Sequence, residues 1–257
     1  MKKLFFLCSL LCLSLTLQGQ ENFLFTIHAV QIEGDLESFE KVESMYMQRV
    51  AQAAVDKGEI MGWSLNKSMH LDNINDEENF NYVFIQSAKD VQGIVSPKSA
   101  WWNNAKDILS SKELKEVEEL QKTFSWKKDV KVLYQVESAI WDNKYDGSVV
   151  FQFNFAKPKN SNGFVEENKT LWRPFFEKNK SKLNMIGWGV ASKVHPRGED
   201  WSDVVTWDAF KNLEDLYQYR IGVDGVNPPS EKSNMQEYNP DGFSNSPIYV
   251  GIATTKN

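Results

Sequence analysis

The sequence predicts an α+β fold in which one strand–helix–strand–strand–helix–strand unit occurs twice. The first observation is a repeat at an offset of 125 residues. Three matches carry it: Gly62-Trp63 with Gly187-Trp188, His70 with His195, and Phe39 with Phe164. The second observation is that apolar residues switch between a strand period and a helix period in nearly the same order in both halves. Repetition at this length indicates that one structural unit was duplicated.

The first twenty residues are set apart from the fold. A basic start at Lys2-Lys3 precedes an apolar run over 4–17, which is the layout of a secretory signal peptide and is short for a membrane span. Cys8 and Cys12 lie in this run, but each follows a leucine rather than the small residue typical of a lipid-attachment site. We therefore expect residues 1–20 to be removed and the protein to be exported, to the periplasm or out of the cell, without lipidation.

Composition narrows the function classes. The 237 residues that follow the signal contain no cysteine, because both cysteines of the 257-residue chain lie within it. Disulfides, thiolate metal sites and cysteine nucleophiles are thereby excluded. Loss of the two signal lysines takes the formal net charge from −6 to −8. An acidic chain without a basic stripe argues against a nucleic-acid partner, and no membrane span is expected in the mature chain.

Residues 21–143 are predicted to form the first unit. A strand over 23–32 leads into a helix with Asp35 as its N-cap and Gly58 after its C-terminal end. The rest of the unit comprises strands over 60–69 and 80–87, a helical region over 99–123 that Ser110-Ser111 can divide, and a strand over 130–140. This order is that of the ferredoxin-like split unit.

Residues 144–257 are predicted to form a second ferredoxin-like unit with a degenerate second helix. Its elements are a strand over 148–156, a helix over 164–183 kinked at Pro174, strands over 185–194 and 203–210, a short helix over 213–220, a turn-rich stretch over 222–247 and a final strand over 248–253.

Two motifs carry a resemblance. The helix of each unit is followed by Gly-Glu-Ile-Met-Gly-Trp at 58–63 or Leu-Asn-Met-Ile-Gly-Trp at 183–188, which resembles the dimeric α/β-barrel superfamily. The step Trp-Arg-Pro-Phe at 172–175 is similar to uncharacterised exported tandem-repeat proteins of Bacteroidetes-type bacteria, although the first unit has Tyr-Met-Gln-Arg at 46–49 and lacks the proline. The resemblance implies two fused units in one pseudo-twofold barrel, and therefore a monomer. It also implies an activity class, because some members bind haem or oxidise aromatic substrates without a cofactor.

Trp63 and Trp188 are candidate ligand-binding residues, one in each unit. Each follows a glycine on the strand after the first helix, where an indole can line a cavity between sheet and helices and stack on a flat apolar ligand. The alternative is that both indoles fill the core. We favour the core, because large aromatic side chains dominate cores generally.

The histidines and Asn81 supply polar candidates. His28 lies within the first strand, and if it points inward it is the best polar group for an apolar pocket. His70 and His195 lie where strands turn into loops, so exposure is favoured over a role as general base or axial ligand. Asn81, matched by Thr206 in the second unit, either orients a substrate carbonyl or lies on the outward face of its strand.

The sequence contains no motif that indicates metal-dependent or nucleotide-dependent chemistry. The acidic stretch 72–78 lacks EF-hand spacing and is read as a solvated turn, so no metal site is expected. The chain has no His-Glu-x-x-His, Gly-x-Ser-x-Gly, P-loop or Gly-x-Gly-x-x-Gly pattern, and no cofactor is predicted.

Three functions remain open. The first is binding of a small apolar or aromatic molecule in a barrel cavity. The second is a cofactor-independent or haem-linked oxygenase or isomerase, and the third is a structural or interaction module with a solid core. The candidate ligand-binding residues are His28, Trp63, His70, Asn81, Trp188 and His195.

Overall fold

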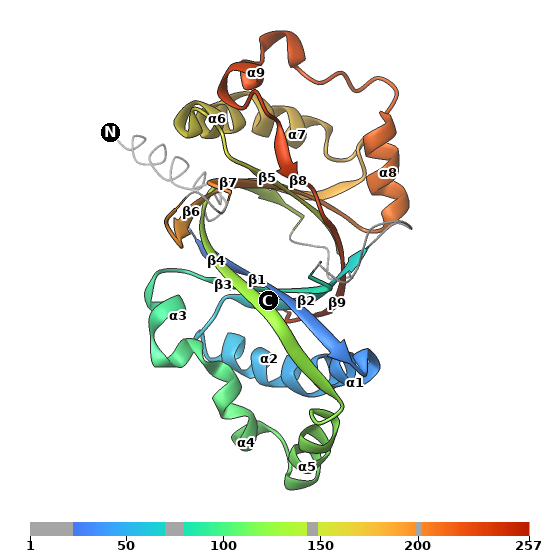
Figure 1. Ribbon diagram of the computed structural model, residues 1–257. Coiled ribbons are helices and arrows are strands. Elements are labelled where there is room, and N and C mark those ends of the chain that lie inside the picture. Colours follow the sequence, from blue (N-terminus) through green and yellow to red (C-terminus); the bar gives the residue numbers. More distant parts are fainter. Residues whose placement is uncertain (1–22, 70–79, 143–148, 199–201, 257) are drawn as a thin grey trace, which may run out of the picture.

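The protein is a closed antiparallel β-barrel with helices packed on two opposite sides (Figure 1). The computed structural model describes residues 23–69, 80–142, 149–198 and 202–256. The predicted signal segment and His70 lie outside these residues.

The first half contributes four strands and the helical layer on one side of the barrel. Its elements are β1 (Leu24–Gly34), α1 (Leu36–Lys41), the π-helical η1 (Val42–Met47), α2 (Gln48–Asp56), β2 (Gly62–Met69), β3 (Tyr82–Ala88), α3 (Gln92–Val95), η3 (Pro97–Ser99), η4 (Trp101–Asn104), α4 (Ala105–Ile108), α5 (Ser111–Leu120) and β4 (Phe124–Trp141). Asp35 caps α1 by accepting hydrogen bonds from the backbone N–H groups of Glu37 and Ser38, as predicted. Ser110 forms a capping box with Glu113, which explains why the second helical region divides there.

The second half follows the same course with a smaller second helical region. Its elements are β5 (Val150–Ala156), α6 (Ser161–Glu167), the π-helical η5 (Asn168–Trp172), α7 (Arg173–Asn179), β6 (Met185–His195), β7 (Val204–Phe210), α8 (Leu213–Ile221), η6 (Ser230–Lys232), α9 (Met235–Tyr238), β8 (Phe243–Asn245) and β9 (Ile248–Thr254).

The strand order closes the barrel. The hydrogen-bonded order is β7-β6-β4-β1-β3-β2-β9-β5, and a further pairing between β7 and β5 completes a ring of eight antiparallel strands. Strand β8 is attached to β5 outside this ring. The order β4-β1-β3-β2 recurs in the second half as β9-β5-β7-β6. Because β2 pairs with β9 and β4 with β6, each half joins the other along two seams.

The interior of the barrel is filled by side chains. Inward-facing residues of the ring form one buried cluster, which includes Phe25, Ile27, Val83, Val132, Tyr134, Val136, Phe153, Ala191, Val205, Trp207 and Tyr249. Gly189 makes room for this packing, because a Cβ there would lie 2.1 Å from Cζ2 of Trp207. Gly187 is covered in the same way by the indole of Trp141. The expected ligand cavity inside the barrel does not fit this packing.

Two further cores lie outside the ring, one beneath each helical layer. The first joins α1, α2 and the 101–117 region to the outer faces of β1, β2 and β3, and contains Phe39, Val42, Val50, Trp63 and Tyr82. The second joins α6, α7 and α8 to the outer faces of β5, β6 and β7, and contains Phe164, Phe176, Trp188, Phe210 and Leu216. Large aromatic residues therefore hold both layers to the barrel.

The long helix of each half widens into a π-helical turn at corresponding positions. In the first half Ser44 donates its hydroxyl to the carbonyl oxygen of Glu40, and in the second half Thr170 donates to that of Glu166. These side-chain bonds to the preceding turn accompany distortion of a helix. Pro174, predicted to kink the helix, lies two residues after the end of the second π-helical segment.

Candidate binding site beneath the second helical layer

An aromatic pocket lies between α7, α8 and the segment that follows α8. It has a volume of about 300 Å³, and its main lining residues are Trp172, Phe175, Phe176, Tyr219, Val223 and Val226. Leu183, Gly222, Pro228 and Ser230 complete the lining. The wall is thus largely aromatic and aliphatic, as in sites that bind small apolar molecules.

The aromatic rings of the pocket wall are held by mutual contacts. Phe176 is buried and stacks on Trp188 with a centroid distance of 5.0 Å. On its other sides Phe176 contacts Phe175 at 5.1 Å and Trp172 at 6.2 Å. Tyr219 approaches from α8 and contacts Phe176 at 6.4 Å. Trp188 therefore supports the pocket from behind without lining it.

Glu167 ties the segment over the pocket to the helix below it. Its Oε1 accepts hydrogen bonds from Nε1 of Trp172 at 3.0 Å and from the hydroxyl of Ser233 at 2.6 Å. Its Oε2 accepts from the backbone N–H of Asn234 at 2.7 Å. One buried carboxylate thus fixes both an indole of the pocket wall and the 233–234 backbone.

A chain of hydrogen-bonded polar side chains lies on the outer face of β5 and β7, beside α8, and all of its members except Arg220 are buried. The guanidinium of Arg220 donates from Nε to Oε1 of Gln152 at 2.9 Å, and Nε2 of Gln152 donates to Oδ1 of Asn154 at 2.9 Å. Nδ2 of Asn154 then donates to Oδ2 of Asp208 at 2.9 Å. All three bonds run from the cation to the carboxylate, so each polarises the next.

Within this series of hydrogen-bonded side chains, Asp208 is the group that titrates near neutral pH. Burial raises the pKa of Asp208 to about 6, against the opposing effects of the Asn154 hydrogen bond and the charge of Arg220. Burial, followed by the nearby Asp208 carboxylate, raises the pKa of Tyr219. Tyr219 also lines the aromatic pocket, so the charge of Asp208 acts on one residue of the pocket wall.

His28 and Trp63 lie under the first helical layer, away from this pocket. The His28 side chain does not point into the barrel. Its Nε2 lies 2.9 Å from Oδ2 of Asp129, and its ring contacts Phe84 and Trp126. Burial lowers the pKa of His28. Trp63 contacts the same Phe84 ring at 6.0 Å from within the buried core, so the two candidates share one aromatic neighbour while His28 lies at the edge of that core.

The other predicted residues are dispersed. Trp188 is buried in the second core, His195 is exposed at the end of β6, and His70 lies outside the described residues. Asn81 pairs with the backbone of Ile32, accepting from its N–H and donating to its carbonyl oxygen, both at 2.8 Å. This pairing occurs where the register between β1 and β4 shifts, so the Asn81 side chain supplies hydrogen bonds to the backbone at an irregular point of the strand pairing.

Sequence reasoning missed the pocket residues and Asp208. Gln152 and Asn154 were visible as polar positions between phenylalanines, and on the paired strand they lie opposite Asp208 and Thr206. A search for polar residues at matching positions of β5 and β7 would have found this patch. The pocket residues Val223 and Val226 lie in a turn-rich stretch without a regular pattern of apolar residues, so no signal in the sequence indicates that they line a site.

Haem does not fit the aromatic pocket through histidine. Its lining contains no histidine, and the two histidines among the described residues, His28 and His195, lie elsewhere. In the part of the chain that the structure describes, no acidic, histidine or cysteine cluster could hold a metal ion. Within the same ranges, no helix has both the length and the apolar character needed to span a bilayer.

Comparisons with known proteins identify the architecture. No protein-family model and no curated protein matches the sequence. A candidate monooxygenase from Fusobacterium nucleatum superposes with a TM-score of 0.52 and 9% identity, over 92% of this chain and 95% of that one. A candidate monooxygenase from Lactobacillus acidophilus gives 0.46 with 14% identity, over 92% and 97%. A chlorite dismutase from Candidatus Nitrospira defluvii gives 0.43 with 9% identity, over 89% and 90%. At such identities the likeness concerns the fold alone: this chain is similar to proteins with a ferredoxin-like barrel.

Proposed function

We propose that the protein binds a small aromatic or apolar molecule in the pocket between α7, α8 and the segment after α8. The observation that carries this proposal is the aromatic lining by Trp172, Phe175, Phe176 and Tyr219 around about 300 Å³. A flat ring can stack on these side chains, while the Tyr219 hydroxyl offers one polar contact that fixes orientation. The site thus lies outside the barrel, whose interior is filled.

A binding experiment with a filled-pocket variant tests this function. Titration calorimetry with 1-naphthol should show binding to the wild type, and Val226→Trp should weaken it by about tenfold or more because the added indole occupies the pocket. Val95→Trp is the matched control, since Val95 is 64% exposed and lies in the first half. Equal affinity of all three proteins, or no binding to the wild type, would contradict the proposal.

A second candidate function is cofactor-independent oxygenation of a phenolic aromatic molecule in the same pocket. The observation that favours it is a buried carboxyl group with a pKa of about 6, next to a tyrosine that lines the pocket. Such a group is suited to accept a proton near neutral pH. The fold shared with a candidate monooxygenase from Fusobacterium nucleatum is consistent with this chemistry.

Oxygen uptake distinguishes catalysis from binding alone. With 1-naphthol the balanced reaction consumes one dioxygen and gives 1,4-naphthoquinone and one water, so an oxygen electrode and the quinone absorbance should report the same rate. Asp208→Asn should lower that rate by about 100-fold or more, since loss of a general base typically costs this much. Binding without oxygen uptake would refute the oxygenase function and leave ligand binding as the function of the pocket.

Duplication, export and a monomeric state complete the proposal. Duplication of one ferredoxin-like unit is supported by the recurring strand order and by the matched π-helical turns with their Ser44 and Thr170 hydrogen bonds. A circular permutant that begins at residue 144 should then form the same barrel, with an unchanged circular-dichroism spectrum. The mass of the protein from its natural host should place the first residue at 21, and sedimentation should give the mass of one chain.

A further inference from the structure

One wall of the aromatic pocket is a connecting segment rather than a long helix or a strand. We call it the strap: residues 222–234, which run from the end of α8 to the start of α9 (Figure 1). Half of the ten lining residues belong to the strap, namely Gly222, Val223, Val226, Pro228 and Ser230. The other half, which includes all four aromatic residues, comes from the 172–183 region and α8. A movement of the strap alone therefore uncovers the aromatic side chains.

Few contacts hold the middle of the strap. In the part of the chain that the structure describes, the backbone N–H groups of residues 223–233 donate hydrogen bonds only to carbonyl groups of the strap itself. Val223 and Val226 pack against the second core, whereas most of the other side chains of the strap are exposed. A segment with little buried apolar surface and only local hydrogen bonds opens at a small cost in free energy.

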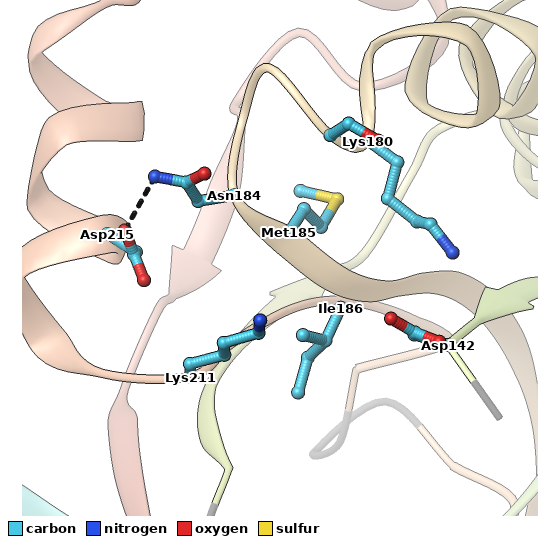
Figure 2. Close-up of a pocket in the computed structure, with 8 residues that line it drawn as sticks. Asp142, Lys180, Asn184, Met185, Ile186, Lys211 and Asp215 are labelled. Atoms are coloured by element: carbon cyan, nitrogen blue, oxygen red, sulfur yellow. Dashed lines mark hydrogen bonds between the residues drawn. The ribbon is translucent and has the colours of Figure 1, made fainter. Parts of the chain in front are cut away.

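The strap starts from a helix that is fixed at both ends. In the first turn of α8, Oδ1 of Asp215 accepts a hydrogen bond from Nδ2 of Asn184 at 2.8 Å (Figure 2). A separate pocket of about 400 Å³ lies beside this bond, and its lining includes no residue of the strap. In the last turn of α8, Nε of Arg220 donates to Oε1 of Gln152 at 2.9 Å. Opening of the pocket therefore begins after α8 and leaves the helix in place.

Glu167 holds the far end of the strap. Its buried carboxylate accepts hydrogen bonds from the hydroxyl of Ser233 at 2.6 Å and from the backbone N–H of Asn234 at 2.7 Å. Its third hydrogen bond, from Nε1 of Trp172 at 3.0 Å, joins it to the pocket wall. Release of Ser233 and Asn234 therefore exposes the carboxylate to water, while Trp172 keeps its hydrogen bond and its position.

The near end of the strap contains two residues whose conformation suits only glycine. Gly222 has a φ of 111° and Gly225 a φ of 72°, and a Cβ at either position meets no atom within 4 Å. Glycine is thus required there by the backbone conformation and not by a close contact. Pro228 and Pro229 follow, and their fixed φ angles stiffen the middle of the strap. Rotation at the two glycines therefore moves the stretch after them as a unit.

We propose that the strap is a lid over the aromatic pocket, with hinges at Gly222 and Gly225 and a latch at Glu167. This inference rests on the proposed binding of a small aromatic molecule in the same pocket. In the closed form Val223 and Val226 complete the apolar wall, and the ligand lies between them and the aromatic rings. The ligand contacts both sides of the pocket, so it favours the closed form, and its entry and release require opening.

Hydrogen exchange of the ligand-free protein tests the lid apart from ligand binding. Gly225→Ala places a Cβ in the left-handed conformation, and Ser233→Ala removes one bond of the latch; neither residue lines the pocket. In both variants the Asn234 amide, which bonds to Glu167, should exchange about fivefold faster or more. Gly58→Ala is the matched control, because Gly58 has a similar φ of 69° and free space for a Cβ but follows α2 in the first half. Equal exchange at Asn234 in the wild type and in all variants refutes the lid.

Stopped-flow fluorescence with 1-naphthol tests whether the lid controls access to the pocket. Both strap variants should raise the association and dissociation rate constants by about fivefold and leave the Kd within about twofold of the wild type, because both rates pass through the open form. A lost ligand contact, by contrast, raises mainly the dissociation rate constant. If 1-naphthol binds both variants with wild-type rates, the lid is wrong while the binding function stands. If 1-naphthol does not bind the wild type, the binding function fails, and the lid fails with it as a gate for this pocket, whatever the exchange rates are.

Discussion

Replacing Asp208 with asparagine is expected to stabilise the protein above neutral pH and to have little effect in acid. Burial raises the pKa of this carboxyl from its ordinary value of 3.8 to about 6, so the folded state binds the proton more tightly than the unfolded state does. Stability therefore falls as pH rises from about 4 to about 7, and stays reduced above that range. A shift of roughly two units corresponds to about 3 kcal/mol of unfolding free energy.

Asparagine keeps the shape and the hydrogen bond from Nδ2 of Asn154 without the cost of a buried charge. Urea unfolding followed by tryptophan fluorescence should show Asp208→Asn to be more stable than the wild type by about 1 to 3 kcal/mol at pH 8, with a difference near zero at pH 4. Asp241→Asn, at an exposed position, is the control and should show no such trend. If Asp208→Asn instead destabilises the protein at pH 8, the chain from Arg220 stabilises the carboxylate more than burial penalises it, and the reasoning is wrong.

Three other substitutions probe the packing and the half-buried histidine His28. Gly189→Ala should destabilise the fold by about 1 to 3 kcal/mol, because its Cβ would lie 2.1 Å from the Trp207 ring, and urea unfolding measures the loss. Trp188→Ala removes the ring that stacks on Phe176 and should cost about 3 to 5 kcal/mol in the same assay; a loss below 1 kcal/mol would contradict its core role. The lowered pKa of His28 means that the folded state resists protonation, so stability is lost as pH falls through about 6.5. His28→Gln should therefore melt with a smaller difference between pH 7 and pH 5 than the wild type, and an equal difference would argue against this linkage.

Local chemistry explains which elements were predictable. The first helix carries its own start at Asp35 and its end before Gly58, which has a φ of 69°, so its bounds follow from the sequence. Strand β4 starts at Phe124, well before the expected 130, and the polar 125–129 stretch hides it. That stretch is a strand because it pairs with β1 across a shift in register. The cause is a long-range contact, which the local sequence does not show. The short α9 and β8 within 222–247 are likewise seated by long-range contacts such as that between Glu167 and Asn234.

Prediction of the candidate site required the direction of each side chain on its strand. The alternation of polar and apolar residues along a strand does not say which set faces the barrel interior. Along β5 the phenylalanines face the barrel interior while Gln152 and Asn154 face the helices. This choice is stable because Arg220 and Asp208, more than 50 residues away in the chain, satisfy the two amides. Gly187, beside Trp188, admits the Trp141 indole on the opposite face of the strand.

The position of β9 in the ring has a consequence for synthesis. Ser64 of β2 and its β9 partner Thr254 are 190 positions apart, and β9 follows the other seven ring strands in the chain. Until β9 has been translated, β2 lacks one neighbour and the two halves are joined only along the β4–β6 seam. A nascent chain therefore presents an unsatisfied strand edge, which is a template for intermolecular pairing. A chaperone that shields β2 and β5 during translation should therefore raise the yield of soluble protein more than one that acts after release.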